Sequence, residues 1–310
     1  RLPCALAVAV MGRAPALSEN SHSEPPLPRF VHFTQPPGTS PGHFPVLVWE
    51  VALQSWRRWF PAREGFQHLF WTDENLTDCI RQEFPQFLSD FVALPGGIEM
   101  ADVGRYCVLH RSGGVYADLD YEARRSFYHE LPAGLVSLLE CRSKDLGIEV
   151  ENALMASPPR HPLWRRAVEE TFGAAGAHRW DDSQGGTGPR MLSSLLKGEE
   201  GLRTRQWVHV LPCAKYQRSV AADSGSAHCG SVADDGSTRQ RGIHWSTTSH
   251  TSFVGAALRA DAFFLLHPEV RGRSLFRESM VHEVAVHSAG SAEAAPRGGA
   301  AASAPLLLAC

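Results

Sequence analysis

The amino-acid sequence predicts a Rossmann-type α/β fold, in which a mostly parallel sheet is flanked by helices in a single domain. Short apolar segments with strand character alternate along the chain with longer segments whose apolar residues recur at helical spacing. Polar residues directly follow two of the expected strands, at Thr72-Asp73 and at Asp118-Leu119-Asp120. Hydrophobic residues make up 43% of the 310 residues, which is enough for a substantial core. This alternation predicts a ligand site at the carboxyl ends of the strands.

The first four elements alternate between strand and helix. Ranges 29–33 and 66–71 predict short buried strands, because each is apolar and bounded by turn-forming residues. Between them, the range 44–59 has apolar residues at helical spacing. The range 76–84 predicts a second helix, with its N-terminal cap near Asp73 to Asn75.

The stretch 101–121 begins with helical character. Asp102 and Arg105 are three residues apart, so they share one face of the expected helix and can reach the same ligand. Gly113-Gly114 then ends the helix, because glycine tolerates the backbone angles of a tight turn.

The same stretch ends in a short strand that carries two carboxylates. Strand alternation would place Tyr116, Asp118 and Asp120 on the same side. Two carboxylates at the mouth of a strand, beside a glycine turn, suit a divalent cation that carries phosphates.

The second half of the domain continues the alternation. Strands are expected at 135–141, 152–156 and 207–211, and helices at 163–172 and 190–196. The segment 243–245 returns to order, and the segment 261–267 is apolar and short enough for a final packing element.

The domain is expected to span residues 27–283, between two segments of different composition. Residues 1–26 form an apolar stub and a Pro-rich linker, and 284–310 are a low-complexity tail. Within the domain, 219–241 predicts a flexible surface loop. The apolar start fits either the cut end of a signal sequence or membrane anchor, or a disordered terminus. The sequon Asn75-Leu76-Thr77 adds support for a secretory protein.

Charge and cysteine content exclude some classes of function. A formal net charge of −3 argues against a nucleic-acid partner bound by broad electrostatic attraction. The seven cysteines contain no CxxC pair, which argues against a zinc site, and their spacing does not fix the redox compartment. Cys107 and Cys141 are interpreted as small core hydrophobes.

The string from Asp102 to Asp120 resembles the sugar-transferase family that contains a DXD motif, glycosyltransferase family 32. This family includes initiating α-1,6-mannosyltransferases, inositol-phosphorylceramide mannosyltransferases and α-1,4-galactosyltransferases. The resemblance implies a GT-A-like fold with a single catalytic domain. Four further segments resemble the family in the expected order: Leu27–His32, Phe70–Asp73, Asn152–Ser157 and Thr187–Pro189.

The resemblance implies an activity and its partners. The chain would be a metal-dependent, retaining glycosyltransferase that moves a hexose, mannose or galactose, to a glycan or glycolipid acceptor. The donor would be GDP-mannose or a UDP-hexose, and the cofactor Mn²⁺ or Mg²⁺. The catalytic domain would lie in the lumen of the secretory pathway, at the Golgi membrane, with an anchor upstream of Arg1 or already lost.

The resemblance also implies a metal-binding set. Asp120 would bind the cation directly, and Asp118 would reach it through water or contact the ribose and the donor sugar. His244 would be the third ligand, with His250 as its rival, because His250 stands where the family has Trp after Ser249.

The remaining carried-over roles concern the substrate. Asp102 and Arg105 would hydrogen-bond the hydroxyls of the donor sugar. The other residues expected to bind substrate are Trp71 and Asp73 near the base and ribose, Tyr116 at the nucleotide, and Asn152, Thr187 and Gly188.

Two alternatives from other classes stay open. One is a catalytically weak module that only binds a nucleotide sugar. The other is a phosphatase-like or nuclease-like metal hydrolase, which would need more acidic ligands near Asp118 and Asp120 or a second metal. Arg105 also has an interpretation without ligand binding, because it could pair with Asp102 as an ordinary ion pair on a helix. The sequence leaves the donor, the acceptor and the linkage open.

Overall fold

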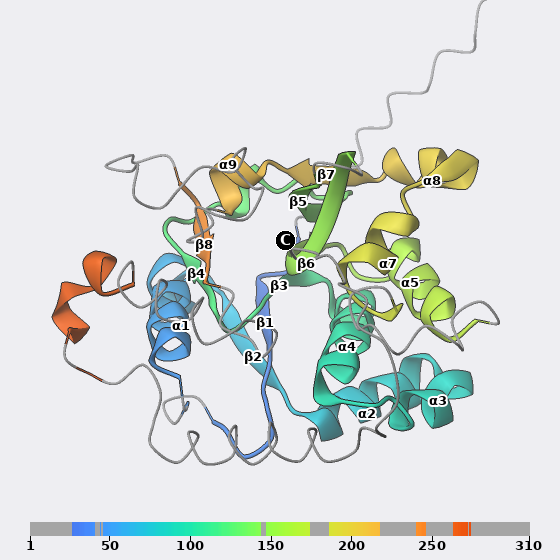
Figure 1. Cartoon of the computed structure of the whole chain (residues 1–310), viewed down its shortest axis with the longest axis horizontal. Helices are drawn as coiled ribbons and strands as arrows, with labels where there is room; N and C mark the ends of the chain where they lie inside the picture. Colours follow the sequence, from blue (N-terminus) through green and yellow to red (C-terminus); the bar gives the residue numbers. More distant parts are fainter. Residues whose placement is uncertain are drawn as a thin grey trace, which may run out of the picture.

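The computed structural model describes residues 27–40, 44, 46–143, 147–173, 186–217, 240–245, 263–271 and 273. They form a six-stranded sheet with helices on both faces, and a small two-stranded sheet beside it (Figure 1). The large sheet has the order β2 (Gln67–Trp71), β1 (Phe30–Thr34), β3 (Gly114–Ala117), β6 (Gly147–Ser157), β5 (Val136–Ser143) and β7 (Val208–Leu211). The small sheet pairs β4 (Tyr121–Ala123) with β8 (Gly242–His244).

Strand direction confirms the predicted mostly parallel sheet. β1 is parallel to both β2 and β3, and β5 is parallel to β7. β6 is antiparallel to both of its neighbours, β3 and β5, so among the described strands of this sheet it alone is reversed. The polar ends of β1, β2 and β3 therefore meet at one edge, as parallel strands require.

Helices cover the two faces of the sheet unequally. One face packs on α1 (Leu47–Trp59), whose Trp56 donates a hydrogen bond of 2.7 Å to the Tyr121 carbonyl. The other face is covered by α2 (Asp73–Glu83), α4 (Gly97–Ser112), α5 (Pro162–Phe172) and α7 (Pro189–Ser194). Shorter helices are α3 (Leu88–Val92), α8 (Gly198–Arg205) and α9 (Cys213–Tyr216), with 3-10 turns at Ala62–Glu64, Pro85–Phe87, Tyr128–Glu130 and Pro268–Val270. None of the described helices is long and apolar enough to cross a bilayer.

The helix boundaries around the site follow the predicted signals. Thr72 caps α2, and its side chain and that of Asn75 each accept a hydrogen bond from the other residue's backbone N–H. Gly113 ends α4 with a φ of 61°, and Gly114 follows with a φ of 98°. A Cβ on Gly113 would lie 2.5 Å from the backbone nitrogen of Pro159, so glycine is required there.

The structure corrects the strand interpretation of the DxD segment. β3 ends at Ala117, and residues 118–120 form a turn that leads into β4. The Tyr121 N–H donates a 2.9 Å hydrogen bond to the Asp118 carbonyl and closes this turn. Asp118 and Asp120 therefore come together through a turn and not through the two-residue period of a strand.

The interpretation of Cys107 as a simple core hydrophobe is wrong. Cys107 on α4 forms a disulfide with Cys79 on α2, and both residues are buried. Sequence spacing gave no sign of this pair, because the two cysteines meet only after α2 and α4 pack against each other. The disulfide fixes the helix that carries Asp102 and Arg105.

The C-terminal expectations are tested only in part. Residues 263–266 are helical and Phe263 is buried, which supports a packing element within 261–267. Most of the expected loop 219–241 and the positions of Ser249 and His250 lie outside the described residues.

Candidate functional site

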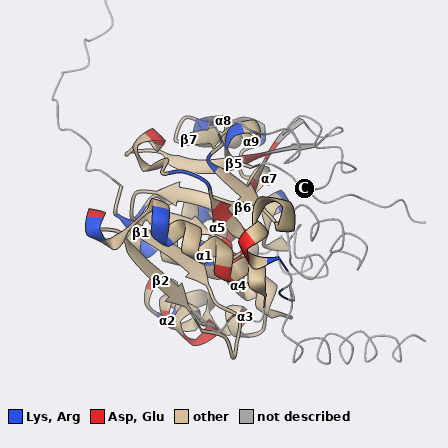
Figure 2. Cartoon of the chain, turned by 90° about the vertical axis from the view of Figure 1, so that its left-hand side faces the viewer, with Lys and Arg blue, Asp and Glu red and all other residues tan. Residues whose placement is uncertain are grey.

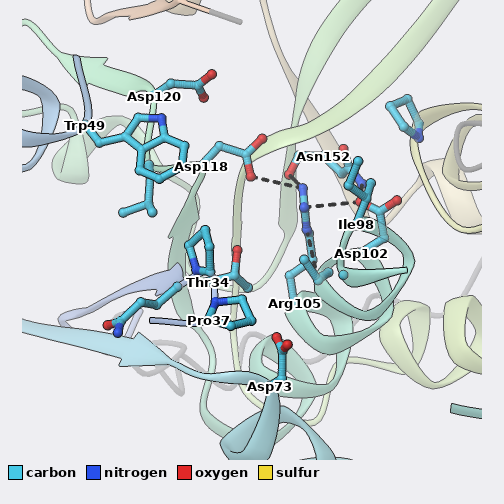
Figure 3. A pocket seen from close by; sticks show the side chains of 16 residues that line it. Thr34, Pro37, Trp49, Asp73, Ile98, Asp102, Arg105, Asp118, Asp120 and Asn152 are labelled. Carbon is cyan, nitrogen blue, oxygen red and sulfur yellow. Dashed lines mark hydrogen bonds and ion pairs between the residues drawn. The ribbon is translucent and has the colours of Figure 1, made fainter. Parts of the chain in front are cut away.

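A cavity of about 400 Å³ opens at the carboxyl ends of β1 and β3 (Figure 3). Its apolar wall includes Trp49 of α1 and Ile98 of α4, neither of which the sequence pattern indicated as a site residue. Its polar wall is formed by Asp73, Asp102, Arg105, Asp118, Asp120 and Asn152. The cavity thus brings together six of the residues that were expected to bind the donor or the metal. In Figure 2, several acidic residues lie between α1, α4 and β6, in the middle of the view.

Arg105 is the hub of the polar wall. Its guanidinium lies 3.2 Å from a carboxylate oxygen of Asp102 and 3.2 Å from one of Asp118, and it donates to the Asn152 carbonyl at 3.0 Å. The guanidinium carbon lies 4.7 Å from the centre of the Tyr116 ring. Burial opposes the charge of Arg105, but the carboxylates outweigh it and hold its pKa above the usual range.

Asp102 is held by hydrogen bonds on both of its oxygens. The Asn152 amide donates to one oxygen at 2.8 Å, and the Thr187 hydroxyl donates to the other at 2.8 Å. Burial raises the pKa of Asp102, and the charge of Arg105 opposes this shift. Asn152 lines the cavity, whereas Thr187 and its neighbour Gly188 lie outside the lining, and Thr187 reaches Asp102 from there.

Tyr106 completes this network, although the sequence pattern indicated no role for it. Its hydroxyl accepts from the Asn152 amide at 3.2 Å and donates to the Thr187 carbonyl at 2.9 Å. Tyr106 stands one turn beyond Asp102 on α4, so its position on the helix face was a signal that could have found it.

Tyr116 forms a hydrogen bond with Asp118 from outside the cavity lining. Its hydroxyl donates to an Asp118 oxygen at 2.8 Å and accepts from the Thr34 hydroxyl at 2.9 Å. Tyr116 is fully buried and does not line the cavity, so the structure places it behind the site expected to bind the nucleotide. Burial raises the pKa of Asp118, and the charge of Arg105 opposes this shift.

Of Trp71 and Asp73, only one lines the cavity. Asp73, the first residue of α2, lines the cavity, whereas Trp71 does not. The Trp71 indole donates to Nδ1 of His32 at 3.1 Å, and Nε2 of His32 donates to the Gly113 carbonyl at 2.8 Å. These bonds fix a neutral His32 with its proton on Nε2, and burial lowers its pKa to about 4. His32 thus ties β1 to β2 and to the glycine turn beside the site.

Asp118, Asp120 and His244 form a cluster that could hold a metal ion. Each offers a ligand atom, and these atoms lie within 4.8 Å of one another. Nε2 of His244 lies 3.3 Å from an Asp120 oxygen. Burial lowers the pKa of His244, but the charge of Asp120 outweighs burial and raises that pKa to about 9.

The small sheet explains why His244 reaches a turn more than a hundred residues earlier. β4 directly follows the Asp118–Asp120 turn and pairs with β8, which places Tyr121 opposite His244. The Trp245 N–H donates to the Asp120 carbonyl at 3.1 Å. Two carboxylates and one imidazole form a donor set that suits Mn²⁺ or Mg²⁺, and three protein ligands leave positions for phosphate oxygens.

Residues 49–137 match a family model described as the glycosyltransferase sugar-binding region containing a DXD motif. The chain is similar to the mannosyl phosphorylinositol ceramide synthase SUR1 of Saccharomyces cerevisiae, with 29% identity over 55% of this chain and 42% of the relative. It is similar to the inositol phosphoceramide mannosyltransferase 2 of Schizosaccharomyces pombe, with 32% identity over 47% of this chain and 39% of the relative. The matches thus span about two fifths of the length of these relatives.

Two solved glycosyltransferase structures have some similarity to this chain. Mouse xyloside xylosyltransferase 1 has a TM-score of 0.45 and 14% identity, over 72% of this chain and 99% of the other. The PaToxG glycosyltransferase has a TM-score of 0.43 and 13% identity, over 58% of this chain and 73% of the other.

Proposed function

We propose that the chain is a metal-dependent, retaining hexosyltransferase, starting from the match of residues 49–137 to the glycosyltransferase sugar-binding region that contains a DXD motif. It would move a hexose from a nucleotide sugar to a glycan or glycolipid. The observation that carries this proposal is that the cluster Asp118, Asp120 and His244 contributes two carboxylates to the same cavity wall as Asp102 and Arg105.

The proposed chemistry follows from the charges around the cavity. Asp118, Asp120 and His244 would hold Mn²⁺ or Mg²⁺. The bound cation would neutralise the negative charge that develops on the phosphates of the leaving nucleotide. Asp102 would accept hydrogen bonds from sugar hydroxyls, because Asn152 and Thr187 fix its carboxylate at the cavity wall.

Arg105 would keep this polar wall in place during the reaction. Its guanidinium links Asp102 on one side to Asp118 on the other, so it couples the residues assigned to the sugar with those assigned to the cation. Because the anomeric carbon gains oxocarbenium character, ordered oxygens nearby would stabilise the transition state.

We propose mannose as the first donor sugar to test. Two of the similar proteins reported above are a mannosyl phosphorylinositol ceramide synthase and an inositol phosphoceramide mannosyltransferase. Their similarity motivates GDP-mannose as the donor and a glycolipid as the acceptor. A UDP-hexose is the second choice.

We further propose that the domain works in the secretory pathway, on the luminal side of the Golgi membrane. The Cys79–Cys107 disulfide supports an oxidising compartment, since cytosolic thiols are generally kept reduced.

A donor panel tests the proposed function. Purified protein is incubated with Mn²⁺ and each common nucleotide sugar, and nucleotide release is measured with and without a glycolipid acceptor. We expect release from GDP-mannose, and its loss in the Asp120→Asn variant with the thermal midpoint preserved. Tight, metal-dependent nucleotide binding without any release would favour the binding-module alternative. A two-metal hydrolase is less well supported, because the described residues supply a single cluster of this kind.

A further inference from the structure

Glu151 of β6 is a buried carboxylate that the site described above does not use. Only 2% of the residue is exposed. One of its oxygens accepts from the Gln217 amide at 2.7 Å and lies 3.8 Å from Nδ1 of His244. Its other oxygen is buried without a hydrogen-bond partner among the described residues. A buried carboxylate with an unsatisfied oxygen is costly, so its presence calls for an explanation.

The alternation of β6 explains how Glu151 reaches His244. Its neighbour Asn152 points to the opposite side of the strand, where it bonds Asp102 and Arg105. Glu151 therefore faces β8 and the small sheet. Neighbouring residues of one strand thus face the two halves of the site.

The His244 ring lies between two carboxylates. Nε2 faces Asp120 at 3.3 Å, and Nδ1 faces Glu151 at 3.8 Å. The second distance is too long for a hydrogen bond and corresponds to a charge contact in the absence of a cation. An imidazole that binds a metal through one nitrogen commonly gives its other N–H to a carboxylate, which fixes the tautomer and the ring orientation.

We propose that Glu151 is a positioning residue for His244: it keeps the ring proton on Nδ1 and leaves Nε2 for the cation held with Asp118 and Asp120. This inference rests on the cation site of the proposed function. It assigns Glu151 no contact with the substrate. Glu151 and His244 come from strands far apart in the sequence, and a lone Glu beside the Asn152 motif gave no signal before the fold was known.

The first measurement reads the tautomer directly in the wild-type chain. Histidine is labelled with ¹⁵N, Mg²⁺ is added because it is diamagnetic, and the His244 signals are assigned by their loss in His244→Gln. We expect the pattern of a ring protonated on Nδ1 and not on Nε2. A Mg²⁺-loaded ring protonated on Nε2 would overturn the proposal without the need for any Glu151 variant.

The second measurement compares Mn²⁺ affinity in Glu151→Gln and Glu149→Gln by electron paramagnetic resonance titration. Glu149 is a matched control, since it lies two residues away on β6 and pairs with Lys197 at 3.2 Å. We expect Glu151→Gln to bind Mn²⁺ about 10- to 100-fold more weakly, and Glu149→Gln to bind it like the wild type. Thermal midpoints of both variants without metal verify that they are folded.

The outcomes separate this proposal from the proposed function. Equal Mn²⁺ affinity in the wild type and a folded Glu151→Gln overturns the role of Glu151, even if hexose transfer is found. The converse outcome is that Glu151→Gln weakens Mn²⁺ binding while the wild type transfers no hexose. That result contradicts glycosyl transfer and leaves the role of Glu151 standing. A wild-type chain that binds no Mn²⁺ or Mg²⁺ overturns both.

Discussion

At the scale of single residues, charge compensation dominates the site. Arg105 lies between Asp102 and Asp118, at 3.2 Å from each. All three residues take part in further hydrogen bonds, to Asn152, Thr187 and Tyr116. Removing one member of such a buried set leaves charges without a partner, and this penalty exceeds the net benefit of the pair itself.

The first prediction concerns Arg105. We expect Arg105→Ala to lower the free energy of unfolding by about 3–5 kcal/mol, because the buried Asp102 and the partly buried Asp118 would lose their cation. Arg111→Ala serves as the control, since Arg111 is exposed on the same helix. Urea unfolding followed by circular dichroism measures both variants. Equal stability of the two variants would contradict the role given to Arg105.

The second prediction concerns His32. Burial lowers the pKa of His32 from 6.5 to about 4. Between these two pH values, the unfolded chain therefore binds a proton at His32 that the folded chain does not bind. Stability should therefore fall as the pH drops from about 6.5 to about 4, with a contribution of about 3 kcal/mol from this group.

Replacing His32 tests this pH dependence. In His32→Gln the contribution should vanish, so the stability difference from the wild type should shrink as the pH drops from about 6.5 to about 4. His209→Gln is the control, on the partly exposed strand β7. Urea unfolding at several pH values measures the difference. Parallel stability curves for His32→Gln and the wild type would contradict the assignment.

At the scale of elements, the packing of α2 against α4 positions half of the site. The Cys79–Cys107 disulfide joins the two helices, and Gly104 lets them approach closely. A Cβ on Gly104 would lie 2.7 Å from the side chain of Leu76. The position of Asp102 on α4 thus depends on contacts that are separate from the cavity.

The third prediction concerns this disulfide. We expect the double variant Cys79→Ala/Cys107→Ala to lose about 3–4 kcal/mol of stability, because the cross-link restricts the unfolded chain. Unfolding in urea compares the variant with the wild type. Alkylation of the denatured, unreduced protein followed by mass spectrometry checks the bond itself. Free thiols at both positions would contradict it.

How far the sequence predicts the elements depends on local signals. β1, β2 and the cap of α2 carry their own patterns, so the helix start at Thr72 was expected within a few residues. The turn at 118–120 and the short strand β4 were not predicted, because three residues paired with a distant partner show no periodicity. The reversed direction of β6 likewise depends on tertiary pairing.

At the scale of the whole molecule, the sheet brings distant segments to one edge. Asp73, Asp102, Asp118 and Asn152 were expected near a ligand, and all of them line one cavity. Trp71, Tyr116, Thr187 and Gly188 lie outside its lining, from where Tyr116 bonds Asp118 and Thr187 bonds Asp102. A resemblance transfers residue types, but it does not tell which side chains face the ligand and which hold their neighbours. That distinction requires the packing of the complete fold.

The measurement that tests the central claim most directly is Mn²⁺-dependent transfer from GDP-mannose to an inositol phosphoceramide acceptor. The wild-type protein should release GDP and form a mannosylated lipid in the presence of Mn²⁺, and chelation of the metal should stop both. Asp120→Asn should lose this activity while it keeps the thermal midpoint of the wild type. A folded protein that releases no nucleotide from GDP-mannose or from any common UDP-hexose, with Mn²⁺ or Mg²⁺ present, would contradict the proposed function.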